Sequence, residues 1–272
     1  MPGIEQLAVF LLFGLLSGIL GGFFGVGGGT IYVPVLTAFY AEHAGLGAPF
    51  VAFIIGNSLF LTLISGLSGS YKQYRLQNFY GKETLIIGLA GAATAVLVSA
   101  ALTSMPWYDK ATFSWFFTLI LLPMVLRMFW KRNQSTDSQW QVPRNKLVVI
   151  GLASGCVSAL TGLGGGVVMV PLLSEWLKLP MRMATSLSLG AIVVMASSSV
   201  AWYVLQADSP TLSDWQWGMI ALPAVVPMGI GVLLSAPWGV KWGNKVKPAW
   251  SKSLFLVFFI LVILQMHFRI FY

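Results

Sequence analysis

The sequence predicts an all-α integral membrane protein made of two homologous halves. Of its 272 residues, 57% are hydrophobic and 9% are charged, and the mean hydropathy is +0.81. A chain of this composition favours hydrocarbon over water. A glycine-rich run also recurs 137 positions along the chain: Gly25-Val26-Gly27-Gly28-Gly29-Thr30 returns as Gly162-Leu163-Gly164-Gly165-Gly166-Val167, each time four residues before a proline. The repeat indicates an internal duplication.

Eight apolar blocks have lengths suited to a bilayer core, which a helix of about 20 residues can cross. In chain order they are residues 7–39, 50–70, 85–103, 113–129, 147–177, 184–205, 215–235 and 253–268. The longest polar stretch, 131–146, joins the halves. We therefore expect a first membrane repeat at 1–130, a cytoplasmic linker at 131–146 and a second membrane repeat at 147–272.

The first block of each half is too long for one straight helix. Residues 7–39 would extend about 50 Å at about 1.5 Å per residue, well beyond a hydrocarbon layer of about 30 Å. A cluster of glycines is also a poor helix interior. Each half is therefore expected to consist of a glycine-broken helical hairpin followed by three transmembrane helices.

The distribution of lysine and arginine chooses between two topologies. If every block crossed once, the halves would be parallel, and seven of the 16 basic residues would lie opposite the linker. If the first blocks are hairpins, the halves are inverted, and only Lys110 and Arg269 lie on that side. Because basic residues collect on the cytoplasmic side, inverted repeats are favoured, with parallel repeats as the alternative.

The ionisable residues argue against an enzyme. Every aspartate, glutamate and histidine lies at the end of a block or in a connection, whereas a metal centre or a catalytic carboxylate pair in the membrane needs ionisable groups at depth. Neither glycine run is followed by the Lys-Ser/Thr of a phosphate-binding loop. The formal charge of +8 is scattered between membrane blocks rather than gathered on one face. We expect no catalysis, metal, cofactor or nucleic acid.

The polar residues deep in the blocks are neutral: Thr30, Asn57, Ser58, Thr62, Ser65 and Ser68 in the first half, and Thr185, Ser186, Ser188, Ser197, Ser198 and Ser199 in the second. Asn57-Ser58-Leu59 and Thr185-Ser186-Leu187 are taken as corresponding segments. At each glycine run the returning arm would direct its helix N-terminus and free N–H groups toward the protein centre, which is a ready anion site. The candidate substrate-binding residues are Gly27, Gly28, Gly29, Thr30, Asn57, Ser58, Gly164, Gly165, Gly166, Thr185 and Ser186.

Other glycines are better explained by packing. Gly14, Gly18 and Gly22, and likewise Gly151 and Gly155, recur at intervals of four, the spacing that lets membrane helices approach closely. At the glycine runs, in contrast, the arm that ends offers backbone carbonyls that suit a cation, so coupling to H⁺ or Na⁺ is an open option.

At these residues the chain resembles the TauE/SafE sulfite exporter family, also called toluene sulfonate uptake permeases. The resemblance rests on Gly25–Gly29 with Pro34-Val35-Leu36, on Gly162–Gly166 with Pro171-Leu172-Leu173, and on Thr185-Ser186-Leu187. It implies a multi-pass secondary transporter of the bacterial cytoplasmic membrane, with a small sulfur-containing anion such as sulfite or an organosulfonate as substrate and lipid as its surroundings. Where that family often has Gly-Thr-Ser-Leu, this chain has Gly56-Asn57-Ser58-Leu59.

Two other functions remain open at this point. One is a carrier or channel for another small anion or an organic acid. The other is a membrane scaffold that transports nothing. The direction of transport, the coupling ion and the oligomeric state are not read from the sequence.

Overall fold

The computed structural model describes residues 3–103, 105, 108–109, 111–113, 115–116, 118–119, 122, 142–206, 211–246 and 260. The first half contains α1 (Ile4–Phe24), α2 (Gly29–Phe39), the short 3₁₀ helix η1 (Ala41–Leu46), α3 (Ala48–Arg75) and α4 (Gly81–Thr103). The second contains α6 (Arg144–Thr161), α7 (Gly166–Pro171), the π-helical turn η2 (Leu172–Trp176), α8 (Met181–Val204), β1 (Gln216–Trp217), β2 (Ile220–Ala221) and α9 (Leu222–Gly243). Most of the predicted blocks 113–129 and 253–268 and of the linker lies outside the described residues.

The prediction of an all-α membrane protein is confirmed. In the described part of the chain, five helices are long and apolar enough to cross a membrane: α1, α3, residues 81–102 of α4, α8 and α9. Both long first blocks are broken at the glycine run, since α1 ends at Phe24 before α2 begins at Gly29, and α6 ends at Thr161 before α7 begins at Gly166.

The predicted helical block at 215–235 is wrong in its bounds. Residues 216–221 form the antiparallel pair β1–β2, and α9 begins only at Leu222 and continues to Gly243. The positive φ of 57° at Gly218 allows the turn between the strands, and Pro223 in the first turn suits a helix start. Hydropathy misses this boundary because the strands are only two residues each and lie directly before an apolar helix. Similarly, α6 begins at Arg144, inside the expected linker.

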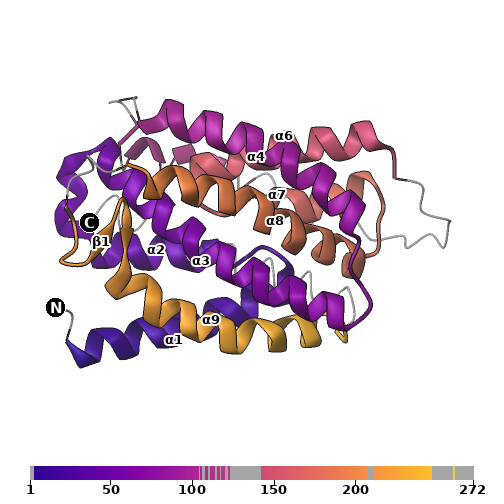
Figure 1. Cartoon of the computed structure of the whole chain (residues 1–272), viewed down its shortest axis with the longest axis horizontal. Helices are drawn as coiled ribbons and strands as arrows, with labels where there is room; N and C mark the ends of the chain where they lie inside the picture. The colour runs from indigo at the N-terminus through magenta and orange to yellow at the C-terminus, as the bar shows by residue number, and fades with distance from the viewer. Residues whose placement is uncertain are drawn as a thin grey trace.

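Small residues allow the helices of the two halves to pack closely. The helix α1 lies along α9, and α6 lies along α4, with α3 and α8 in contact with each other (Figure 1). A Cβ built on Gly14 would lie 2.2 Å from the carbonyl oxygen of Met228, and one on Gly151 would lie 2.5 Å from that of Ile87. The packing role predicted for these glycines is confirmed.

The contacts also show how the helices are directed. Gly14 meets Met228 and Gly22 meets Ala236, so α1 and α9 run in the same direction. The same comparison for the other neighbouring helices shows that α1, α3 and α9 run in one direction and that α4, α6 and α8 run in the opposite direction. Corresponding helices of the two halves are therefore antiparallel.

As a result, one end of the bundle is basic. All lysines and arginines in the described ranges lie at the last turns of α3 and α9, at the first turns of α4, α6 and α8, or in the adjoining segments: Lys72, Arg75, Lys82, Arg144, Lys146, Lys178, Arg182, Lys241 and Lys245. Glu5, Glu42 and Asp214 lie at the opposite end, whereas Glu83 and Glu175 share the basic one. We call these the basic end and the acidic end.

Candidate functional site: two facing glycine loops

The two glycine loops, residues 25–28 and 162–165, touch each other inside the bundle. A Cβ built on Gly29 would lie 2.7 Å from the Cα of Leu163, and one built on Gly166 would lie 2.7 Å from the Cα of Val26. These are backbone-to-backbone approaches that a side chain would prevent. All residues of both loops are buried.

Both loops have the same backbone conformation. The glycines at the first, third and fourth positions of each run have φ angles between 70° and 81°, which is the left-handed region: Gly25, Gly27, Gly28, Gly162, Gly164 and Gly165. Residues with a Cβ adopt this region at a cost of about 1–2 kcal/mol each. The repeated glycines are thus required by the break in the helix as well as by the contact between loops.

The returning helix α2 presents free donors at the break. The N–H groups of Ile31 and Tyr32 donate to the carbonyl of Gly28, but those of Gly29 and Thr30 have no acceptor among the residues that the structure describes. This is the expected state of a helix N-terminus, where the dipole also favours a negative charge. In the second loop, Gly166 and Val167 begin α7 in the same way.

Two hydroxyls brace the loops from the opposite halves. Ser58 on α3 donates a hydrogen bond of 2.7 Å to the carbonyl of Gly162, and Ser188 on α8 donates one of 2.6 Å to the carbonyl of Gly25. Ser58 and Ser188 are therefore structural counterparts. The predicted correspondence of Asn57-Ser58-Leu59 with Thr185-Ser186-Leu187 is wrong by two residues, because similarity of residue type misled the alignment of these segments.

Thr62 on α3 and Ile192 on α8 lie between the loops. A Cβ on Gly27 would lie 2.6 Å from the Cγ2 of Thr62, and one on Gly164 would lie 2.3 Å from the same atom. The side chain of Ile192 would lie 3.4 Å from the Cβ built on Gly27 and 3.8 Å from the one built on Gly164. Both side chains are fully buried, so in this structure they fill the space between the loops.

The structure places the other candidate residues less centrally. Asn57 is fully buried, but its amide nitrogen donates to the carbonyls of Phe53 and Met219, and its oxygen accepts from the N–H of Ala221. Its side chain therefore fastens the β1–β2 pair to α3. Ser186 donates to the carbonyl of Asn78, near the connection between α3 and α4.

Thr185 lies nearer to the loops than Ser186 does. Its Cα is 2.8 Å from a Cβ built on Gly25, while its hydroxyl donates to the carbonyl of Arg182. Of the predicted site residues, the structure brings together the loop glycines, Thr30, Ser58 and Thr185.

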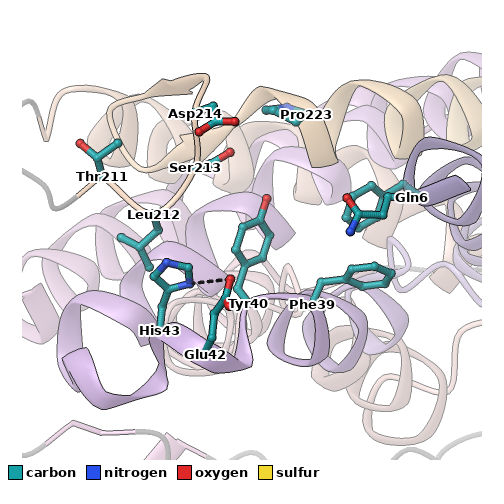
Figure 2. A pocket seen from close by; sticks show the side chains of 11 residues that line it. Gln6, Phe39, Tyr40, Glu42, His43, Thr211, Leu212, Ser213, Asp214 and Pro223 are labelled. Carbon is teal, nitrogen blue, oxygen red and sulfur yellow. Dashed lines mark ion pairs between the residues drawn. The ribbon is translucent and has the colours of Figure 1, made fainter. Parts of the chain in front are cut away.

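A cavity opens at the acidic end, over the mouth of the first hairpin. It has a volume of about 430 Å³ and is lined by residues 6, 10, 39–40, 42–43, 211–214 and 223. Figure 2 shows the Tyr40 hydroxyl pointing toward the 211–214 segment, with His43 and Glu42 paired at 3.8 Å beside it. Burial raises the pKa of Tyr40, so its hydroxyl stays neutral.

A second cavity opens at the basic end, over the mouth of the second hairpin. Its volume is about 460 Å³, and Asn78, Tyr80, Glu83, Val142, Pro180, Arg182 and Met183 line it. Neither of these two cavities is lined by a loop glycine. The contacting loops thus lie between two openings at opposite ends of the bundle.

The family model described as "Sulfite exporter TauE/SafE" matches residues 10–266. The chain belongs to this family. The resemblance predicted from the glycine runs is confirmed, and a multi-pass membrane transporter is the function that family membership supports.

Individual relatives of this TauE/SafE protein have similar lengths. A "Probable membrane transporter protein" of Methanocaldococcus jannaschii is 25% identical over 242 residues, covering 89% of this chain and 88% of the relative. The similarly named YdhB of Bacillus subtilis is 26% identical over 257 residues, covering 91% and 94%, and one from Haemophilus influenzae is 22% identical, covering 94% and 96%. No solved structure matches the chain.

Three residues at the centre of this TauE/SafE protein were absent from the predicted site: Thr62, Ser188 and Ile192. Thr62 and Ser188 are among the deep polar residues of the sequence, but nothing in their spacing separates them from their neighbours. The contacts with the loops reveal them, because Thr62 and Ile192 both touch Gly27 and Gly164. Continuing the repeat in the correct register, from Ser58 to Ser188, would have paired Thr62 with Ile192.

Proposed function

We propose that the protein is a secondary transporter that moves a small sulfur-containing anion, such as sulfite or an organosulfonate, across the cytoplasmic membrane of a bacterium. The anion binds between the two glycine loops. The observation that carries this proposal is the pair of N–H groups at Gly29 and Thr30, which lie buried at the start of an 11-residue helix, beside the opposite loop, with no acceptor in the part of the chain that the structure describes.

Neutral donors suit transport of an anion. An oxyanion that leaves water needs several hydrogen bonds to replace its hydration. Backbone N–H groups and a helix N-terminus supply them without the strong attraction of a buried arginine. Within the described ranges the lysines and arginines all lie at the basic end, so a bound anion remains free to dissociate.

The arrangement of the halves supports alternating access. Antiparallel counterparts and basic residues at a single end are what inverted repeats in a membrane would give. In this structure the loops touch, so substrate must separate them in order to bind. Movement of one half against the other would then connect the site first with the cavity at Tyr40 and then with the cavity at Arg182. The backbone carbonyls where each helix is interrupted, such as that of Gly25, offer ligands for a coupled H⁺ or Na⁺.

Transport by the purified protein in proteoliposomes tests this proposal. Radiolabelled sulfite, sulfoacetate and taurine are offered with imposed pH and sodium gradients, and Gly164→Ala is compared with Gly45→Ala. Gly164 has a φ of 71°, and a Cβ at this position would clash with the side chain of Thr62. A Cβ on Gly45, in contrast, would have no atom within 4 Å.

We expect accumulation of at least one sulfur-containing anion by the wild type and by Gly45→Ala, with strong loss in Gly164→Ala. Transport of carboxylates alone would reassign the substrate to another small organic acid. Absence of transport of every anion, with Gly28→Leu and Gly165→Leu leaving the cellular role of the protein intact, would favour a scaffold.

A further inference from the structure

The two halves agree in geometry around the loops but differ in chemistry. Thr62 and Ile192 occupy equivalent positions, and both face Gly27 and Gly164, yet one side chain carries a hydroxyl and the other is a hydrocarbon. Three residues further along each helix, Ser65 corresponds to Met195. In the hairpins, Tyr32 of α2 corresponds to Met169 of α7.

The polar members of these pairs gather on one side of the loops. The hydroxyl of Tyr32 lies 2.7 Å from a Cβ built on Gly28, and the Tyr32 and Ser65 hydroxyls are both buried without a hydrogen-bond partner in the described part of the chain. In the second half, a Cβ built on the equivalent glycine, Gly165, would lie 3.2 Å from the thioether methyl of Met195 instead. Apart from the matched pair Ser58 and Ser188, α2 and α3 thus place hydroxyls at positions where α7 and α8 place the hydrocarbon of Ile192 and the thioethers of Met169 and Met195.

Two buried hydroxyls of the second half do not alter this contrast. Ser154 and Ser158 lie on α6. Gly165 packs on the carbonyl of Ser154, just as Gly28 packs on that of Ser17. Gly21, the counterpart of Ser158, faces the backbone nitrogen of Gly28 in its own loop. These positions lie behind the loops rather than between them.

Thr62 has an unused hydrogen-bonding group at the centre. Its side chain is fully buried, and its Oγ1 has no hydrogen-bond partner in the part of the chain that the structure describes. A buried hydroxyl without a partner costs about 1–3 kcal/mol. Its methyl group is the atom that faces both loops. Rotation by one rotamer step about χ1 moves the hydroxyl to the place of the methyl group and the methyl group to the place of the Cβ hydrogen, which would direct the Oγ1 into the gap once the loops separate.

We infer that Thr62 and Ile192 are a specificity-determining pair, in which the Thr62 hydroxyl donates to an oxygen of the bound anion and Ile192 contacts an apolar substituent. This inference rests on the proposed function of the loops. The site then selects an organic anion that carries a hydrocarbon group beside its charged group, because an inorganic oxyanion would present a hydrated oxygen to Ile192 and leave that oxygen without a donor.

The experiment measures dissociation constants of propane-1-sulfonate and of sulfite by calorimetry for the wild type, Thr62→Val, Thr62→Ser, Ile192→Thr and Ile192→Val. Valine preserves the shape of threonine and removes the hydroxyl, and Thr62→Ser keeps the hydroxyl. Ile192→Val keeps an apolar β-branched side chain and is the matched control for Ile192→Thr, which installs the first-half residue at the second-half position. Melting temperatures identify variants that fold like the wild type.

We expect the wild type to bind propane-1-sulfonate more tightly than sulfite. Thr62→Val should weaken both by about tenfold, the loss of one good hydrogen bond, while Thr62→Ser retains affinity. Ile192→Thr should shift the preference toward sulfite by about tenfold, and Ile192→Val should not.

Two results would overturn the inference while leaving the proposed function intact: tighter binding of sulfite than of the sulfonate by the wild type, or an unchanged preference in folded Ile192→Thr. If folded Thr62→Val binds both anions like the wild type, the role of its hydroxyl is refuted. Should the wild type bind neither anion, the proposed function fails and the inference fails with it.

Discussion

The Ser58 hydroxyl donates a 2.7 Å hydrogen bond to the carbonyl of Gly162, across the boundary between the two halves of the protein. Ser188 makes the reciprocal bond to Gly25 at 2.6 Å. The carbonyl at each helix break has lost its partner within the helix, and a buried carbonyl without a donor is costly. The two serines therefore hold each loop against the opposite half.

Removal of these braces should destabilise the protein. We expect Ser58→Ala and Ser188→Ala each to lower the free energy of unfolding by about 1–3 kcal/mol, because a buried carbonyl loses its donor. Ser197→Ala is the matched control, since Ser197 is exposed and bonds only to Val194 of its own helix. Thermal unfolding in detergent provides the measurement, and equal melting temperatures for Ser58→Ala and Ser197→Ala would contradict the role of the brace.

Asn57 should stabilise the β1–β2 pair. Asn57→Ala removes hydrogen bonds to Met219 and Ala221, and each buried backbone group left without a partner costs about 1–3 kcal/mol. Amide hydrogen exchange, followed by mass spectrometry, should become faster in residues 216–221, and anion affinity should fall more than in Ser68→Ala. Unchanged exchange in that segment, relative to Ser68→Ala, would rule out this role.

Asp109 should stabilise the protein in a pH-dependent way. The N–H of Thr112 donates to the Asp109 carboxylate at 2.9 Å and lowers its pKa. A lowered folded-state pKa means that the stabilisation is fully present above the ordinary pKa of the carboxyl and is lost as pH falls through the lowered value.

The effect of Asp109 is measured by melting curves between pH 3 and pH 7. The described residues 111–113 are helical, and the Asp109 carboxylate accepts from the N–H of Thr112 in their first turn, as an N-cap does. Asp109→Ala should therefore lose about 0.5–2 kcal/mol of stability at neutral pH. Asp109→Asn keeps a capping oxygen without a charge, so it should lose less and should show less pH dependence. Identical pH profiles for the wild type and Asp109→Asn would argue against the titration.

The topology has a direct test with cysteines. In a Cys156→Ser background, Glu42→Cys at the acidic end and Lys245→Cys at the basic end are treated in intact cells with a membrane-impermeant maleimide. We expect labelling of Glu42→Cys from outside and of Lys245→Cys only after the cells are opened. Labelling of both from outside would be incompatible with inverted halves whose basic end faces the cytoplasm.

Much of the fold follows from the sequence because hydropathy and glycine content are local properties. The runs at Gly25 and Gly162 predict both breaks, since four glycines in five residues cannot support a helix in lipid. The start of α9 at Leu222 is not visible in this way, because β1 and β2 are only two residues long and Asn57, which is distant in the chain, bonds to the backbone of Met219 and Ala221.

The site was predicted less completely than the fold. The loop glycines are evident from the repeat, and two breaks that face each other were expected from the duplication. Ser58 was selected as a deep polar residue, but its counterpart Ser188 and the direct contact between the loops were not predicted. Thr62 and Ile192 depend on the register between α3 and α8, which tertiary contacts set. An amide such as Asn57 is equally suited to a substrate and to backbone groups, so its partners are known only from the structure.

A crystal structure with bound 2-bromoethanesulfonate tests the central claim most directly, since bromine is located by its anomalous scattering. We expect the sulfonate between the loops, within hydrogen-bonding distance of the N–H groups of Gly29 and Thr30, and the bromine beside Ile192. Sulfonate bound elsewhere, with Gly29 still in contact with Leu163, would contradict the account.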